Sequence, residues 1–295
     1  MQYKSHILFL ILIMFSKLVL ANSDSSVKDY HLARCSDGTT QYIHSNKFSL
    51  SSQDITRLGK IIFKHECAGK YKNLITWNKG ENFPSLGIGH FIWYPKNKEG
   101  PFHETFPKLI QYIKEKGVKL PLWLASMREI DAPWKSRKEF FARSRSNRKK
   151  LYSLRKFLIN TMNLQTLFII KRLNSSLPKL LCSVSPAKRF DIRNKFYVIA
   201  DSPGGLYSLI DYINFKGEGI SPKERYKGQG WGLLQVLEQM NPIISNKMAV
   251  IEFSRAAKKV LTRRVYNSPK RRHEKRWLKG WKKRIDSYTK LGKFK

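Results

Sequence analysis

The acidic residue Glu66 stands in a sequence context that suits acid–base chemistry. It follows Ile62 by four residues and Leu58 by eight, so a helix through these positions places Glu66 on an apolar face, with Gly69 as a natural stop. A carboxyl group at the end of a helix meets the negative end of the helix dipole, and both that end and apolar surroundings favour the protonated form. A protonated carboxyl group near neutral pH can donate a proton to the leaving oxygen of a glycosidic bond.

The segment after Glu66 favours this chemistry over the alternative, an ordinary surface ion pair with a neighbouring cationic residue, Lys64, His65 or Lys70. Residues 77–90 read Trp-Asn-Lys-Gly-Glu-Asn-Phe-Pro-Ser-Leu-Gly-Ile-Gly-His. Their glycines and proline exclude a helix, while Leu86, Ile88 and His90 alternate with glycines as in a short strand. We therefore predict a β-hairpin or small sheet directly after the helix that Glu66 ends.

This order of a helix-ending glutamate, a hairpin and then Ser-Leu-Gly-Ile-Gly-His at residues 85–90 resembles phage-type lysozymes and the wider lysozyme-like superfamily. The resemblance covers about residues 50–95, with weaker similarity over residues 205–217 and in the basic tail. It implies an α+β, mostly α-helical, lysozyme-like fold with a small β-hairpin or sheet after the first catalytic helix.

The resemblance also implies catalytic roles for three residues. Glu66 would be the proton donor, Ser85 the hydroxyl residue that positions the attacking water, and Glu81 the best candidate for the second carboxylate. The segment between Glu66 and Ser85 is longer than in the phage enzymes, and their usual aspartate is absent. Because some lysozyme-like enzymes work with a single acid, this departure is compatible with catalysis.

Several further side chains could bind a sugar polymer beside these residues. Aromatic rings can stack on the C–H faces of sugars, although Trp77 could equally belong to the core. We interpret the glycine-rich residues 217–232 as a flexible loop that lines the cleft. They lack the strand–GxxxxGK[ST]–helix order of a phosphate-binding loop. The substrate-binding candidates are Trp77, His90, Asn214, Glu218, Tyr226 and Trp231. For His90, which ends the predicted strand, we expect mainly a structural role in holding the sheet.

The remainder of the chain has the periodicity of helices. We predict one domain over residues 48–295, preceded by a polar, irregular arm at 22–47 and ending in basic helices. The expected helices span residues 106–115, 138–143, 149–160, 164–174, 187–199, 206–215, 232–240, 245–264 and 273–288.

Residues 1–21 have the composition of an export signal. Lys4 supplies a positive start, residues 7–15 form an unbroken apolar run, and Val19 and Ala21 occupy the small-residue positions of a cleavage site. The alternative is an uncleaved membrane anchor, but Lys17 interrupts the apolar stretch, which falls short of the ~20 residues that a spanning helix needs. We therefore expect an exported protein, periplasmic or secreted, without a membrane span once the signal is removed.

Three cysteines follow this segment, Cys35, Cys67 and Cys182. In an oxidising compartment we expect one disulfide and one free thiol, and the spacing does not select among the three pairings. The cysteines do not have the spacing of metal ligands, so we predict no metal site, and no motif indicates a cofactor.

The chain is strongly basic, with 57 Lys and Arg against 21 Asp and Glu and a net charge of +36. Removing Lys4 and Lys17 with the signal leaves +34. The cations are most concentrated in residues 135–150 and in residues 255–295, where 17 Lys and Arg face two acidic residues. Such a charge implies a polyanionic partner. For an exported monomer we expect peptidoglycan or another anionic envelope polymer rather than nucleic acid.

These observations lead to one expected function and two alternatives. We expect an exported peptidoglycan hydrolase that cleaves the β-1,4 bond between N-acetylmuramic acid and N-acetylglucosamine, with Glu66 as general acid. Hydrolysis and the formation of an anhydro sugar both remain open. The first alternative is a non-catalytic glycan or envelope binder on the same scaffold. The second is a secreted nucleic-acid binder that uses the basic tail with Trp277, Trp281 and Tyr288.

Overall fold

The described part of the chain is mostly helical with small antiparallel sheets, which confirms the predicted α+β, mostly α-helical class. It contains three such sheets, whereas the sequence predicted one. The computed structural model describes residues 30–44, 50–100, 103–222, 224–242 and 245–291. The helices are α3 (Ser52–Glu66), α4 (Phe106–Glu115), α5 (Leu122–Ala125), α6 (Arg137–Phe140), α7 (Arg145–Asn160), α8 (Met162–Cys182), α9 (Pro186–Ala200), α10 (Gly205–Lys216), α11 (Leu233–Gln239), α12 (Asn246–Asn267), α13 (Lys275–Asp286) and α14 (Tyr288–Leu291), with 3-10 turns at Tyr71–Leu74 and Lys270–Arg272. The predicted export signal at residues 1–21 lies outside the described residues.

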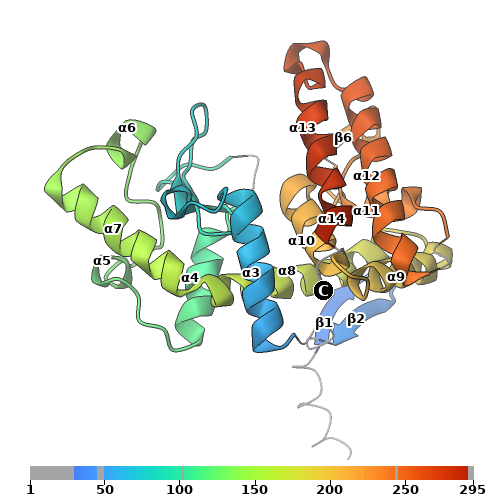
Figure 1. Ribbon diagram of the computed structural model, residues 1–295, viewed down its shortest axis with the longest axis horizontal. Helices are drawn as coiled ribbons and strands as arrows, with labels where there is room; N and C mark the ends of the chain where they lie inside the picture. The colour runs from blue at the N-terminus through green and yellow to red at the C-terminus, as the bar shows by residue number, and fades with distance from the viewer. Residues whose placement is uncertain (1–29, 45–49, 101–102, 223, 243–244, 292–295) are drawn as a thin grey trace, which may run out of the picture.

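Two groups of helices flank α3 (Figure 1). Helices α4 to α7 lie on one side and α9 to α14 on the other, while the long helix α8 runs beneath both groups. At 21 residues and about 1.5 Å per residue, α8 extends for roughly 30 Å. Its apolar side chains, such as Leu173 and Leu177, are buried in one continuous core. The sequence-based prediction ended this helix at Asn174, but α8 continues through Pro178 because both halves of the molecule pack on it.

The predicted sheet after α3 exists, although its strands are shorter than expected. Strands β3 (Ile75–Thr76), β4 (Ser85–Leu86) and β5 (Phe91–Ile92) pair in the order β3-β4-β5. The prediction of a strand over residues 86–90 was wrong, because residues 87–90 form a turn. Gly87 and His90 both have positive φ angles, of 69° and 46°.

The turn is anchored by α8. The Ile88 amide donates to Oε1 of the buried Gln165 at 2.9 Å, and a Cβ at Gly87 would lie 2.3 Å from that same oxygen. Gly87 is therefore required twice, by its φ angle and by the close approach of Gln165.

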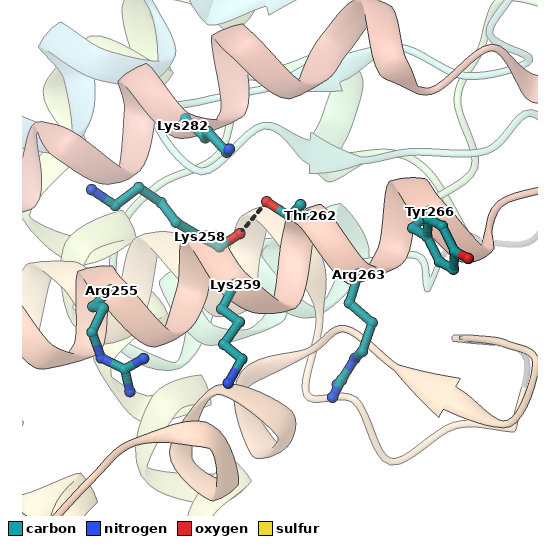
Figure 2. A pocket seen from close by; sticks show the side chains of 7 residues that line it. All are labelled: Arg255, Lys258, Lys259, Thr262, Arg263, Tyr266 and Lys282. Atoms are coloured by element: carbon teal, nitrogen blue, oxygen red, sulfur yellow. Dashed lines mark hydrogen bonds between the residues drawn. The ribbon is translucent and has the colours of Figure 1, made fainter.

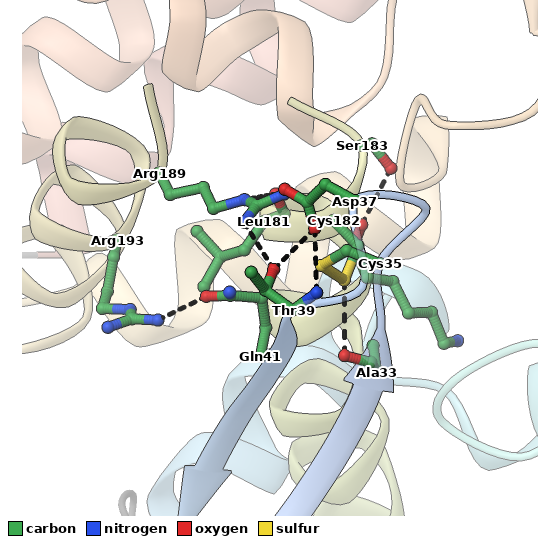
Figure 3. Close-up of a disulfide and its surroundings, with 11 residues drawn as sticks. Ala33, Cys35, Asp37, Thr39, Gln41, Leu181, Cys182, Ser183, Arg189 and Arg193 are labelled. Atoms are coloured by element: carbon green, nitrogen blue, oxygen red, sulfur yellow. Dashed lines mark hydrogen bonds and ion pairs between the residues drawn. A yellow bond between two sulfur atoms is a disulfide. The ribbon is translucent and has the colours of Figure 1, made fainter. Parts of the chain in front are cut away.

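The predicted irregular arm contains regular structure instead. Strands β1 (Tyr30–Arg34) and β2 (Thr40–His44) form an antiparallel hairpin that packs against α8. A disulfide joins Cys35, at the turn of this hairpin, to Cys182 at the end of α8 (Figure 3), so Cys67 is the free and buried cysteine. Arg189 adds an ion pair to Asp37, at 2.6 Å, on the same turn. The local sequence gave little sign of the hairpin because contacts far along the chain hold it.

Helices α12 and α13 form a pair at the C-terminal end (Figure 1), connected to the small hairpin of β6 (Arg225–Tyr226) and β7 (Gln229–Gly230). The fully buried Glu274 joins these elements: it accepts hydrogen bonds from Arg264 at 2.8 Å and from the Tyr226 hydroxyl at 2.8 Å, and Arg272 lies 3.3 Å away. Within the described residues, none of these helices has the length and apolar character that crossing a membrane requires.

Candidate functional site

Glu66 is the last residue of α3, as predicted, and it faces the second half of the molecule. Its Oε1 accepts a hydrogen bond from Nη2 of Arg284 on α13, and its Oε2 lies 3.4 Å from Nδ1 of His90 in the glycine turn. The Glu66 side chain is 13 % exposed. The site thus brings together three elements that lie far apart in the sequence.

Asp211, in the middle of α10, holds Arg284 in place. Arg284 donates to it twice, from Nε at 2.9 Å and from Nη2 at 2.7 Å. The hydroxyl groups of Tyr207 and Tyr288 also donate to Asp211, which is 2 % exposed. A buried carboxylate needs partners of this kind, and here it accepts four hydrogen bonds.

The electrostatics of the cluster keep Arg284 charged and the tyrosines neutral. Burial by itself would lower the pKa of Arg284, but its hydrogen bonds to Asp211 and the charges of Asp211 and Glu66 outweigh that effect and raise it. Burial, and then the charge of Asp211, raise the pKa of Tyr207 and of Tyr288. We therefore describe Arg284 as a permanent cation that one buried and one partly exposed carboxylate share.

Among the other titratable groups near Glu66, the Cys67 thiol does not offer a competing nucleophile. Burial, and then the charge of Glu66, raise the pKa of the Cys67 thiol to about 12, so this thiol stays protonated at neutral pH. Burial lowers the pKa of His65, whose ring lies against Tyr207 with a centroid distance of 5.4 Å. The lowered pKa leaves the His65 imidazole neutral and able to accept a proton, whereas the Cys67 thiol is inert.

The two other predicted catalytic residues are not joined to Glu66 by any of the contacts in the described chain. Glu81 lies in the loop between β3 and β4, where its Oε2 accepts from Asn78 and its carbonyl accepts from the Trp77 indole. Ser85 is buried in β4 between the neighbouring strands. The second carboxylate that comes close to Glu66 is Asp211, through the Nη2 atom of Arg284 that both bind.

Three predicted sugar-stacking residues are either buried or hydrogen-bonded within the protein. Trp77 is 3 % exposed, and its ring meets Phe140 edge-on, so it serves the core rather than an open surface. Trp231 is buried with its ring under the guanidinium of Arg264, 4.1 Å from the centroid. Tyr226 is half-buried, and its hydroxyl is bound to Glu274. These positions correct the expectation of free aromatic platforms.

The remaining candidates from the loop after α10 lie partly exposed. Asn214 is in the last turn of α10 and half-buried. Glu218 follows that helix, with Lys179 of α8 at 3.5 Å from its Oε1. The neighbouring Glu224 accepts from the Gly219 amide at 3.0 Å, and burial, followed by the charge of Glu218, raises its pKa. This loop therefore carries acidic groups, but the described contacts do not connect them to Glu66.

Lys216, at the end of α10, occupies an unusual position beside the cluster. It is buried, with its Nζ 3.3 Å from the centroid of the Trp281 ring and 3.9 Å from that of Phe215. Arg284 stacks on Phe215 as well, at 4.5 Å. Burial, then the charge of Arg264, lower the pKa of Lys216 to about 6.

Sequence reasoning missed Arg284, Asp211 and Lys216. Asp211 left a signal, since it is a single acid within the apolar run of residues 206–215, and a lone acid there must have a buried partner. Arg284 left none, because it is one of 17 cations in the tail and only the packing of α13 against α10 distinguishes it.

Comparisons with known proteins provide no relative for this chain: no family model, no curated protein and no solved structure matches it. The class that the fold defines is thus a mostly helical α+β protein with small antiparallel sheets. The resemblance to lysozyme-like enzymes remains a prediction from residues 50–95.

Proposed function

We propose that the protein is an exported glycoside hydrolase of lysozyme-like type that cleaves the glycan strands of peptidoglycan, with Glu66 as general acid. The observation that carries the proposal is the position of Glu66. It ends a helix, is enclosed except for 13 % of its side chain, and lies between two groups of helices beside Arg284 and His90. A carboxyl group placed in this way can give its proton to the leaving sugar oxygen while water attacks the anomeric carbon.

The arrangement of Arg284 supports a change in the charge of Glu66 during a reaction. Two of the three carboxylate contacts of Arg284 go to Asp211, so the guanidinium keeps a complete ionic partner when Glu66 takes up a proton. When Glu66 has donated its proton, the same guanidinium stabilises the carboxylate that forms. Asp211 acts through Arg284 and is a positioning residue.

The disulfide and the net charge of the chain support the same proposal indirectly. The Cys35–Cys182 disulfide is typical of proteins that leave the reducing cytosol, in agreement with the predicted export signal. The net charge of +36 suits retention on an anionic cell envelope through many weak contacts that salt screens.

The test is digestion of purified peptidoglycan by the mature protein and by Glu66→Gln, with mass analysis of the released sugars. We expect the wild type to release muropeptides and Glu66→Gln to lose at least about 100-fold in rate, the usual contribution of a general acid. Glu81→Gln is the matched control, because it removes a carboxylate from the loop after β3, and we expect it to keep most of the activity. Equal release by wild type and Glu66→Gln would refute the role of Glu66.

A second function, a non-catalytic glycan binder, is favoured by one specific observation. Glu66 is held in an ion pair with Arg284, which suits a structural role for this carboxylate at least as well as proton transfer. If neither protein releases sugars while both sediment with insoluble peptidoglycan, this second proposal replaces the first. A reducing end in the products would indicate hydrolysis, and an anhydro end would indicate intramolecular closure of the sugar.

A further inference from the structure

A basic groove runs along α12, with Lys282 of α13 at its edge (Figure 2). Neither partner of Glu66 lines it. It is a hollow of about 710 Å³, and five of its seven lining residues are cations while none is acidic. The lining residues, which we call the α12–α13 groove, are Arg255, Lys258, Lys259, Thr262, Arg263, Tyr266 and Lys282.

Three of these five cations are arranged in a row. Arg255, Lys259 and Arg263 follow one another at intervals of four residues and point the same way from α12, to the side away from Lys282 (Figure 2). Four residues of helix correspond to about 6 Å of axial rise, so the row presents positive charges at regular steps of roughly this length. A linear polymer with one negative charge per repeating unit could run along such a row.

The charges of the groove are only partly neutralised by the protein. Glu252 pairs with Arg255 at 2.6 Å, and Asp286 pairs with Lys258 at 2.7 Å. Among the described residues, Lys259 and Lys282 have no acidic partner. Arg263 donates from Nη2 to the Gly230 carbonyl at 3.2 Å, but its buried Nε finds no acceptor.

We infer that the α12–α13 groove binds a linear phosphodiester polymer of the polyol phosphate type, carried on the envelope that the proposed enzyme attacks. Arg and Lys side chains bind phosphate oxygens by charge-assisted hydrogen bonds. A polyol phosphate fits better than a single-stranded nucleic acid, because base stacking uses a series of exposed aromatic rings. The groove offers one, Tyr266, which is 83 % exposed.

The groove and the site share helix α13. Lys282 and Arg284 are two residues apart on α13, so they lie on different faces of the same helix, one at the groove and the other at Glu66. A polymer in the groove would thus lie against the helix that also carries the partner of Glu66. The inference rests on the proposed function only for the origin of the polymer, and binding can be measured without cleavage.

The experiment measures binding of a fluorescent glycerol phosphate oligomer to the full mature protein over a range of salt concentrations. The variant is Lys259→Gln/Lys282→Gln, and the matched control is Arg148→Gln/Lys149→Gln, which removes two exposed cations from α7. We expect the groove variant to bind at least about tenfold more weakly. The slope of log affinity against log salt concentration should become less steep by about 1.4. Each phosphate contact contributes ~0.7 to this slope, and the variant removes two such contacts. The control should change affinity less than about twofold, as expected for residues outside the groove.

Three results would overturn the inference. Equal weakening by both double variants would mean that net charge alone binds the oligomer. Tighter binding of single-stranded DNA with the same number of phosphodiesters, lost in the groove variant, would assign the groove to nucleic acid. Equal binding of hyaluronate with the same number of carboxylates would remove the preference for phosphate. Thermal melting checks the fold of each variant. If the double variant melts at a lower temperature than wild type, the single variant Lys259→Gln, at an exposed position, replaces it in the binding measurement. Digestion of peptidoglycan stripped of phosphate polymers tests the proposed function separately.

Discussion

Arg284 and Glu66, which are 218 residues apart in the chain, form an ion pair that joins the end of α3 to α13. The same guanidinium also donates two hydrogen bonds to Asp211. A buried aspartate, an arginine and a partly exposed glutamate are thus connected by a series of ionic contacts. These contacts join α3 to the C-terminal helices. The contact between the two groups of helices at Glu66 therefore depends on Arg284.

Removing Arg284 should destabilise the protein strongly. Arg284→Met leaves Asp211 buried with two tyrosine hydroxyls but no cation, and a broken buried ion pair typically costs about 3–5 kcal/mol in the free energy of unfolding. Asp211→Asn should cost a similar amount. The double variant should be less destabilised than the sum, because the partners are lost together. Urea unfolding measures all three, and additive losses would contradict the coupling.

The disulfide should contribute to stability because it closes a long loop. Cys35 and Cys182 are 147 residues apart, and the constraint on the unfolded chain is worth about 2–5 kcal/mol. We expect a reductant, or the change Cys35→Ala/Cys182→Ala, to lower the melting temperature, with no further effect of reductant on the variant. Cys67→Ala is the control, since this buried thiol is free and its variant should still respond to reductant.

Lys216 should make stability depend on pH in the neutral to alkaline range. Its pKa is about 6 in the folded state against an ordinary value of 10.5, so between these values the unfolded chain binds the extra proton. Stability linked to Lys216 therefore rises as the pH increases from about 6 towards 10. We expect Lys216→Met to be more stable at pH 7, on the order of 1–3 kcal/mol. It should also show a flatter dependence on pH, and an unchanged profile would argue against the neutral amine.

Glu274 should produce a dependence of the same sign, but in acid: its contribution to stability also rises with pH. Burial alone would raise its pKa, but the hydrogen bonds from Arg264 and Tyr226 outweigh burial, so its folded pKa lies below the ordinary 4.5. Its contribution is complete above the ordinary value and is lost as the pH falls through the lower, folded value. We expect Glu274→Gln to be less stable than wild type at pH 7 and the two proteins to converge in strong acid. Denaturant midpoints at several pH values measure the difference.

Gly87 should tolerate no side chain, for two separate reasons. An alanine there must adopt a φ of 69° and would place its Cβ 2.3 Å from Oε1 of Gln165. That oxygen accepts a hydrogen bond from the Ile88 amide in the same turn. Gly80→Ala is the matched control, because Gly80 also has a positive φ, 89°, but no atom lies within 4 Å of the added Cβ. We expect Gly80→Ala to cost about 1–2 kcal/mol of backbone strain and Gly87→Ala clearly more. Equal losses would show that Gln165 moves aside freely.

The local features of this protein could be predicted from its amino-acid sequence alone. The helix that ends at Glu66, the helix Phe106–Glu115 and the break into a small sheet between them were all predictable, because apolar periodicity and glycine or proline positions act over a few residues. The mostly helical α+β class follows from the same local signals.

Contacts between residues far apart in the chain could not be predicted from the sequence and are seen in the folded structure. The pairing of Cys35 with Cys182, the burial of Trp77 and the ionic contacts from Asp211 through Arg284 to Glu66 depend on how distant helices pack. Local preferences carry no information about such contacts, since any of many basic tail residues could have faced Glu66. Side-chain contacts between α13 and α10 place Arg284 beside Glu66. A buried aspartate that also binds two tyrosines makes this position of Arg284 energetically favourable.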